Sequence, residues 1–251
     1  MRSIKNVLAI LCIVALFMMS VPGVVAQGNQ TMIVFASNRD GNAEIYCMND
    51  DGADVRRITN TPRTETVPRA SPDGHKILFS SCEGEVCRHY IMDIDGTNVV
   101  ALPEYDYTDA SDSHSWSPDG RQVIFSTQIE YSPQSWSPST VRKMNIDGTA
   151  MAVLFGYHGV PSENHEYFHS DWSPDGKKIA FYYGPTPSWD CDSDIYVCNS
   201  DGTGRDAVTT DLAGNVWPAW SPDGTKIVFA KERACLSGDR SIYIMDADGN
   251  N

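Results

Sequence analysis

The chain has little positive charge for its size. Its 251 residues carry 19 Lys and Arg against 33 Asp and Glu, which gives a formal net charge of −14 at pH 7. Because an acidic surface repels phosphate backbones, we expect no nucleic acid partner. Hydrophobic residues make up 41% of the chain, which is enough to form a core. The length suits a single all-β domain.

Several motifs of cofactor-dependent and hydrolytic enzymes are missing from the sequence. It contains no Walker phosphate loop, no C-x-x-C pair and no dinucleotide-binding G-x-G-x-x-G. It also lacks the G-x-S-x-G nucleophile elbow of α/β-hydrolases. No Cys and His spacing matches a structural zinc site. These absences favour a non-catalytic protein with no cofactor.

Long apolar runs are missing except near the N-terminus. There, two basic residues precede the apolar run Val7–Met19, Pro22 and Gly23 interrupt it, and the segment ends in the small residue Ala26. This layout is typical of a secretory signal, and the run is short for a membrane span, which needs about 20 residues. We predict a signal peptide over residues 1–26 and a periplasmic or secreted domain over 27–251, with no stable membrane span after cleavage. An uncleaved anchor is the alternative.

Disulfides are permitted if the domain is exported. Cys82 and Cys87 flank an expected hairpin loop and form the favoured pair. Cys191 and Cys235 fall in equivalent loops of successive repeats and form a second candidate pair. The sequence alone leaves the connectivity open. Two further cysteines lie in strand patterns and are predicted to be buried thiols: Cys47 and Cys198.

Three short motifs recur in the same order along the chain. Ser-Pro-Asp-Gly begins at Ser71, Ser117, Ser173 and Ser221. A second motif, Met or Cys followed by Asn or Asp and then x-Asp-Gly, begins at Met48, Met92, Met144, Cys198 and Met245. An apolar triplet ends at Phe35, Phe79, Phe125, Phe181 and Phe229. Such regular recurrence indicates an internally repeated fold.

Each motif has a structural role. In Ser-Pro-Asp-Gly, proline fixes φ at the second turn position and glycine tolerates the exit geometry. Asp-Gly in the second motif is typical of a tight hairpin turn. One repeat is therefore four short antiparallel strands, named a to d in chain order. The consecutive apolar positions of the triplets indicate a sheet buried on both faces. Four-stranded sheets at a period of about 45–50 residues predict an all-β fold, a β-propeller.

The motifs also carry a family resemblance. Trp-Ser-Pro-Asp-Gly-x-x-Ile-x-Phe, together with the segment Ser37–Tyr46, resembles the TolB-type, WD-like propeller repeat, from Thr31 to the end of the chain. The resemblance implies the fold more strongly than a function. Similar blades occur in Tol–Pal envelope proteins, in propellers of prolyl-oligopeptidase-like enzymes and in oligogalacturonate-lyase-like proteins.

The sequence departs from that family in two respects. TolB carries an α/β domain before its propeller, whereas only a few residues separate Ala26 from the first strand here, so we expect a relative of TolB rather than TolB itself. The first repeat lacks strand a and the fifth lacks strand d, which leaves eighteen strands in five blades. We expect a truncated form of a propeller with six or more blades. If the chain is complete, its unpaired blade edges should promote self-association.

Aromatic residues concentrate in the loops that join strand b to c and strand d to the next strand a. Long loops at one end of a rigid scaffold are the usual place for binding, so we predict a binding face there. The alternative is that these loops only cap the blades. The predicted binding residues are Tyr105, Tyr107, Tyr131, Trp136, Tyr157, Tyr167 and Trp189.

One segment resembles a metal-binding motif. His165 to His169 fits H-E-x-x-H, but that zincin chemistry needs both histidines on one helical face. Here the segment leads into the strand that ends at Trp172, where a helix is not expected. A divalent metal site of another kind would use His158, His165 or His169, with Asp171 as a further ligand. Ordinary surface histidines are the alternative.

These observations favour an exported, non-catalytic propeller that binds a protein or a cell-envelope component. The alternative is the propeller part of an enzyme. One version is a prolyl-oligopeptidase-like peptidase whose catalytic domain lies outside this sequence. The other is a metal-dependent lyase similar to oligogalacturonate lyase. The sequence does not identify the ligand.

Overall fold

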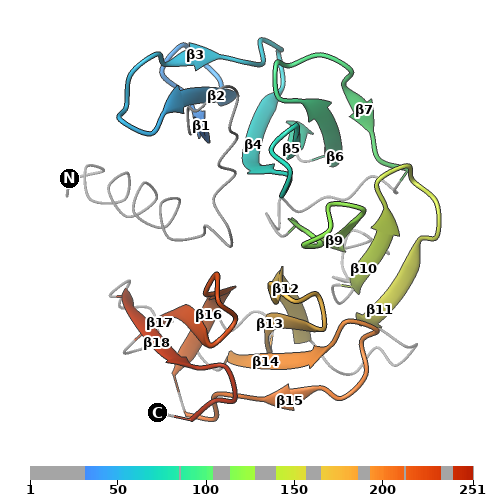
Figure 1. The fold of residues 1–251 in the computed structure, drawn as a ribbon, viewed down its shortest axis with the longest axis vertical. Helices are drawn as coiled ribbons and strands as arrows, with labels where there is room; N and C mark the ends of the chain where they lie inside the picture. The colour runs from blue at the N-terminus through green and yellow to red at the C-terminus, as the bar shows by residue number, and fades with distance from the viewer. Residues whose placement is uncertain are drawn as a thin grey trace.

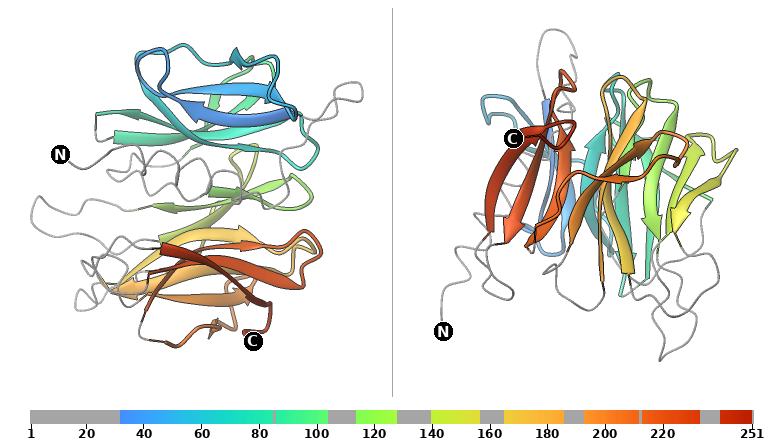
Figure 2. Two further views of the ribbon diagram at one scale, coloured as in Figure 1. Left: turned by 90° about the vertical axis from the view of Figure 1, so that its left-hand side faces the viewer. Right: turned by 90° about the horizontal axis from the view of Figure 1, so that it is seen from below.

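A computed structural model describes residues 32–84, 86–103, 114–127, 140–156, 165–185, 193–211, 213–232 and 240–250. These residues form eighteen β-strands and no helix. Figure 1 shows five antiparallel sheets arranged around a common axis, with β4, β12 and β16 on the inner side. Figure 2 shows the sheets stacked as blades around that axis. The predicted β-propeller is confirmed.

The blades have the strand content that the repeats predict. Blade 1 contains β1 (Met32–Ser37), β2 (Glu44–Asn49) and β3 (Arg56–Arg57). Blade 2 contains β4 (Thr64–Ala70), β5 (Lys76–Glu83), β6 (Val86–Asp93) and β7 (Val100–Ala101). Blade 3 contains β8 (His114–Trp116), β9 (Gln122–Thr127), β10 (Thr140–Asn145) and β11 (Ala152–Gly156). Blade 4 contains β12 (His165–Trp172), β13 (Lys178–Pro185), β14 (Asp194–Asn199) and β15 (Asp206–Ala207). Blade 5 contains β16 (Gly214–Trp220), β17 (Lys226–Glu232) and β18 (Arg240–Asp246).

The Ser-Pro-Asp-Gly segments are the expected a–b turns. In blade 2, the Gly74 amide donates to the Ser71 carbonyl at 2.8 Å, and the Lys76 amide donates to Ser71 Oγ at 2.9 Å. Ser71 Oγ in turn donates to Asp73 Oδ1 at 2.6 Å, which lowers the pKa of Asp73. Equivalent bonds form in blades 3, 4 and 5, beginning at Ser117, Ser173 and Ser221.

The Asp-Gly segments are the expected c–d turns. In blade 1, the Asn49 amide donates to the Ala53 carbonyl at 2.9 Å, and Gly52 has a φ of +83°, which favours glycine. These turns lie at the same end of the propeller as the a–b turns, because both follow strands that run in the same direction. We call this end the turn face. The opposite end, where strands a and c begin, is the loop face.

The hydrophobic core lies between the blades. Ile45 and Cys47 of β2 pack against Ile77 and Phe79 of β5 and Met92 of β6. Similar clusters join blade 2 to blade 3, blade 3 to blade 4 and blade 4 to blade 5. Because each sheet between two others contributes apolar side chains to both neighbours, the prediction of two buried faces is confirmed.

Three inner strands share an irregularity near their middle. In β4, β12 and β16, two residues lie opposite one residue of strand b, and the first of each pair has positive φ. The pairs are Val67–Pro68, His169–Ser170 and Trp217–Pro218. Regular alternation along β12 therefore ends at Phe168, and the backbone of His169 leaves the strand conformation that the sequence predicted.

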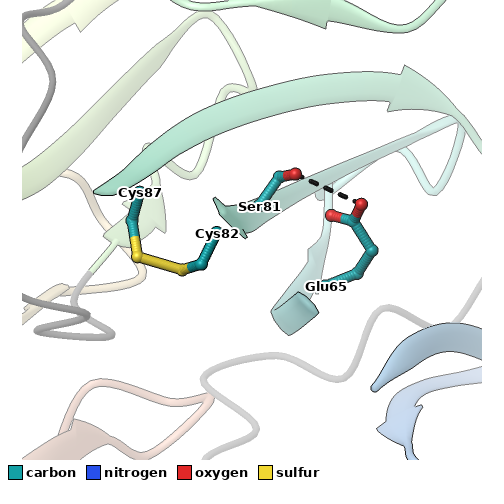
Figure 3. Close-up of a disulfide and its surroundings, with 4 residues drawn as sticks. All are labelled: Glu65, Ser81, Cys82 and Cys87. Atoms are coloured by element: carbon teal, nitrogen blue, oxygen red, sulfur yellow. Dashed lines mark hydrogen bonds between the residues drawn. A yellow bond between two sulfur atoms is a disulfide. The ribbon is translucent and has the colours of Figure 1, made fainter. Parts of the chain in front are cut away.

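The favoured disulfide is present. Cys82 and Cys87 face each other across the β5–β6 hairpin with a Cα–Cα distance of 4.1 Å (Figure 3). Cys47 and Cys198 are buried free thiols, as predicted, and burial raises the pKa of Cys198 to about 12. Cys191 and Cys235 lie outside the described residues, so their pairing stays a prediction. Within the described part of the chain, no helix has the length and apolarity to cross a membrane.

Candidate functional site

A polar group near the propeller axis links three blades. Asp171, the residue before Trp172 in β12, is buried. Its Oδ1 accepts a hydrogen bond from Ser115 Oγ of β8 at 3.2 Å, and its Oδ2 accepts one from the Trp220 amide of β16 at 2.9 Å. Charge-assisted hydrogen bonds of this kind are stronger than neutral ones. Both carboxylate oxygens thus help to fix the relative positions of blades 3, 4 and 5.

Blades 2 and 3 are joined by comparable bonds to the backbone of β4. His114 Nε2 lies 2.7 Å from the Val67 carbonyl, and Trp116 Nε1 donates to the Arg69 carbonyl at 2.9 Å. Both carbonyls belong to residues at the irregular part of β4, where the strand leaves its regular pairing with β5. The irregular backbone therefore supplies acceptors for the next blade.

Two histidines of strands a, His114 and His169, have lowered pKa values. The rings of His89 and His114 lie 4.9 Å apart in an edge-on contact. Burial lowers the pKa of His114 well below its usual value, and the neighbouring His89 and Arg69 lower it further. Burial also lowers the pKa of His169 to about 3, with a smaller effect of Arg69. His169 lies against Tyr182 and Trp217, so its ring occupies an aromatic environment.

Two buried glutamates lie at the loop face. Burial raises the pKa of Glu44, but hydrogen bonds from Thr59, Thr61 and Arg57 outweigh this effect and lower it. Burial raises the pKa of Glu65, and here the hydrogen bonds do not compensate. Glu65 Oε1 accepts from Thr61 Oγ1 at 2.6 Å and from Ser81 Oγ at 3.2 Å; Figure 3 shows the latter bond.

Glu65 has an equivalent in blade 5, Asn215. Each donates its backbone amide at 2.8 Å to the carbonyl just before strand c of the preceding blade, Ala43 for Glu65 and Ser193 for Asn215. Each also holds a buried acceptor, Glu65 Oε2 or Asn215 Oδ1, that has no hydrogen-bond partner among the described residues. Buried acceptors are normally satisfied, so these two oxygens are candidates for contact with a ligand.

Most predicted site residues lie outside the described residues. These are Tyr105, Tyr107, Tyr131, Trp136, Tyr157, His158 and Trp189. His165 and Tyr167 lie in β12, where only the backbone is described. The described residues bring together no three His, Cys, Asp or Glu side chains suited to a metal ion. The binding residues and the divalent metal therefore stay predictions.

Sequence reasoning missed the roles of Ser115, Glu65 and Asn215. The sequence predicts Asp171 only as a possible metal ligand, whereas its two oxygens accept hydrogen bonds from neighbouring blades. A signal was available for Asp171 and Ser115, because each immediately precedes the tryptophan that comes before Ser-Pro-Asp-Gly in its own repeat. That position is polar in three of the four repeats that contain Ser-Pro-Asp-Gly, as Arg69, Ser115 and Asp171, and is Ala219 in the fourth.

The fold and its repeated turns define a β-propeller whose blades are antiparallel sheets of up to four strands, with TolB-like repeats. The TolB beta propeller domain model (PD40) matches residues 26–164, and the chain belongs to this family. A TolB homologue from Chlorobium luteolum is 28% identical over 214 residues, which cover 85% of this chain and 34% of that protein. Dipeptidyl-peptidase 5 from Porphyromonas gingivalis is 24% identical, over 81% of this chain and 35% of the peptidase. The chain spans about a third of these relatives' length.

Solved structures show the same fold. TolB from Acinetobacter baumannii superposes with a TM-score of 0.67 at 18% identity, over 87% of this chain and 50% of that one. An oligogalacturonate lyase in complex with manganese superposes with a TM-score of 0.62 at 15% identity, over 86% and 59% of the two chains. At these identities the likeness establishes the propeller fold alone.

Proposed function

We propose that this protein is an exported, non-catalytic propeller that binds a protein or cell-envelope component at its loop face. Membership of the TolB beta propeller family supports an envelope role. The inter-blade bonds of Asp171, His114 and Trp116 support a rigid scaffold, which favours binding because little order has to be created when the partner docks.

The observation that carries this proposal is the pair of buried acceptors at the loop face, Glu65 Oε2 and Asn215 Oδ1. They occupy equivalent positions in blades 2 and 5, at the end of the scaffold where the predicted aromatic loops are attached. Because both are acceptors, the partner should present hydrogen-bond donors such as backbone amides, hydroxyls or basic side chains. The net charge of −14 also favours a basic partner surface.

The experiment begins with capture of a partner from an envelope extract by the immobilised chain, followed by identification and titration calorimetry. The Trp136→Ala and Trp189→Ala variants should weaken binding by about 10-fold or more, because aromatic anchors dominate interface energies. Glu65→Gln should weaken it less, by replacing an acceptor with a donor. Val153→Ala is the control, since Val153 is exposed on β11 of blade 3 and outside the predicted binding residues. Unchanged affinity of both Trp variants for the identified partner would exclude the loop face.

A propeller that belongs to an enzyme is the second candidate. The 24% identity to dipeptidyl-peptidase 5 over 81% of the chain favours this alternative. Equilibrium dialysis with Zn²⁺ and Mn²⁺, followed by an assay on oligogalacturonate, tests the lyase version. Retained metal together with cleaved substrate would replace the binding proposal. Capture of an envelope protein without turnover would support it.

A further inference from the structure

Two rows of side chains face each other between blades 2 and 3. Paired residues of neighbouring strands point to the same face of a sheet. One such row in blade 2 crosses β4, β5 and β6 and consists of Thr66, Ser80 and His89. The facing row in blade 3 crosses β8, β9 and β10 and consists of His114, Phe125 and Arg142. The centroid of the His89 ring lies 4.9 Å from that of His114 and 5.3 Å from that of Phe125, so the rows are in contact.

The rows are polar at positions where the other repeats are apolar or aromatic. His89 occupies a position of strand c that an aliphatic residue holds in the other four repeats: Ile45, Val141, Ile195 and Ile242. Arg142 occupies a position where the other four repeats have a tyrosine stacked on a phenylalanine of strand b: Tyr46, Tyr90, Tyr196 and Tyr243. The blade fold therefore requires neither polar residue, and departures from a regular pattern concentrate at functional sites.

Four of the six side chains carry a buried polar atom that has no hydrogen-bond partner among the described residues. These atoms are Thr66 Oγ1, Ser80 Oγ, His114 Nδ1 and Arg142 Nε. Ser80 and His114 are only 1% and 2% exposed. Buried polar atoms are normally satisfied by protein, water or ligand, so this interface needs an occupant that supplies the missing bonds. Blades 2 and 3 both have four strands, so the interface has its full complement of strands.

The bonding capacity of these atoms defines the chemistry of the occupant. His114 Nε2 lies 2.7 Å from the Val67 carbonyl, and because a carbonyl only accepts, Nε2 carries the ring proton. Burial lowers the pKa of His114 well below its usual value, so the ring is neutral and Nδ1 is an acceptor. Arg142 Nε is a cationic donor, and the hydroxyls of Ser80 and Thr66 can donate or accept. The occupant must therefore accept from Arg142 and donate to His114.

We propose that the interface between blades 2 and 3 binds a small α-hydroxy carboxylate. The carboxylate accepts from Arg142 Nε and from a hydroxyl of blade 2, and the ligand hydroxyl donates to His114 Nδ1. A carboxylate is favoured because the two rows contain an arginine and no acidic residue. An ammonium group would lack a counter-charge there, which leaves a hydroxyl as the donor. The burial of Ser80 and His114 restricts the ligand to a few heavy atoms.

The Cys82–Cys87 disulfide bounds this site on the side of the loop face. Alternation along β5 and β6 places Cys82 on the same face as Ser80, and Cys87 on the same face as His89. Both cysteines are buried. The disulfide therefore fixes the spacing of the two strands that carry Ser80 and His89, and it separates these side chains from the loop face.

The test uses the 251-residue chain, labelled with isotopes at histidine, and glycolate as the probe. The His114 Nδ1 resonance, recognised through the Nε2 proton bonded to the Val67 carbonyl, should shift and saturate with glycolate up to about 10 mM. Acetate lacks the hydroxyl and glycolamide lacks the negative charge. Each should bind at least ~10-fold more weakly than glycolate, because each leaves a buried group without its partner.

Arg142→Tyr removes the cation and introduces the residue that the other four repeats carry, so the blade should fold. This variant should bind glycolate at least ~10-fold more weakly. Ser80→Ala removes one hydroxyl, introduces the residue of blades 1 and 5, and should bind at least ~3-fold more weakly. Lys143→Val is the matched control, because Lys143 lies on the opposite face of the same strand, where its Nζ donates to the Ser200 carbonyl of blade 4. It should bind glycolate as the unmodified chain does.

Two results would overturn the proposal. A His114 resonance that none of the three probes moves would mean that ordered water alone satisfies these atoms. Equal affinities of the Arg142→Tyr variant and the unmodified chain for glycolate would place the ligand elsewhere. Partner capture at the loop face is measured separately and does not involve these residues, so the two proposals can fail independently.

Discussion

The turn face and the loop face of the propeller are built in different ways. At the turn face, the same bonds recur in four blades, from the Gly74 to Ser71 contact onward. At the loop face, blades 1 and 4 share a carboxylate–threonine pair, Glu44 with Thr59 and Asp194 with Thr209, whereas blade 2 has the Cys82–Cys87 disulfide. Repeated turns thus hold the scaffold in one geometry, and the opposite end can vary without changing it.

The largest loss of stability should come from removing the Asp171 side chain, whose hydrogen bonds join blades 3, 4 and 5 and lie at neither face. Asp171→Ala would leave the buried Ser115 hydroxyl and Trp220 amide without their acceptor. We expect a loss of about 3 kcal/mol in the free energy of unfolding, measured by urea titration. Asp175→Ala, at an exposed turn position, is the control and should cost less than about 1 kcal/mol. Equal losses in the two variants would show that Asp171 does not link the blades.

Two turn glycines allow the cost of backbone strain to be measured separately from the cost of a steric clash between blades. Gly202 and Gly52 have φ of +85° and +83°, but a Cβ at Gly202 would lie 2.5 Å from the Leu154 carbonyl oxygen, whereas one at Gly52 would meet nothing within 4 Å. We expect Gly52→Ala to cost about 1 kcal/mol. Gly202→Ala should cost about 2–3 kcal/mol, because overpacking adds to the strain. Thermal unfolding of both variants measures the difference; similar midpoints would contradict close packing of this turn.

Removing the Cys82–Cys87 disulfide tests how much this bond at the loop face stabilises the protein. The Cys82→Ser, Cys87→Ser double variant should lose about 2 kcal/mol, because the bridge closes only a short loop. The same strands remain paired through β5 and β6, so the propeller should stay folded. Urea titration of oxidised, reduced and variant chains measures this. A variant as stable as the oxidised chain would show that the hairpin is already fixed by its strands.

The smallest effect should be a decrease in the free energy of unfolding in mild acid. The folded-state pKa values of His114 and His169 lie below that of an unfolded histidine, about 6.5, with His169 at about 3. The unfolded chain therefore binds more protons, and stability falls as pH falls below about 6.5. Between pH 7 and pH 6 we expect a loss of about 1 kcal/mol, and His169→Phe should reduce it. An unchanged slope in that variant would contradict the lowered pKa of His169.

The sequence predicted the scaffold far better than the site. Ser-Pro-Asp-Gly and Asp-Gly act within a few residues, so the turns and strands that they imply, such as Ser71–Gly74, were confirmed. The Ser115–Asp171 bond joins residues 56 positions apart. This hydrogen bond depends on how the blades are arranged around the axis, and no local sequence pattern predicts that arrangement. The same holds for Glu65 and Asn215, whose equivalence follows from their bonds to the preceding blades.

The inter-blade bonds near the axis join each blade to the blade that precedes it in the sequence. His114 and Trp116 of blade 3 use carbonyls of blade 2, and the Trp220 amide of blade 5 uses Asp171 of blade 4. In each case the later segment completes a contact whose other half was made earlier along the chain. A chain that emerges from its N-terminal end can therefore fold blade by blade, each blade serving as a template for the next.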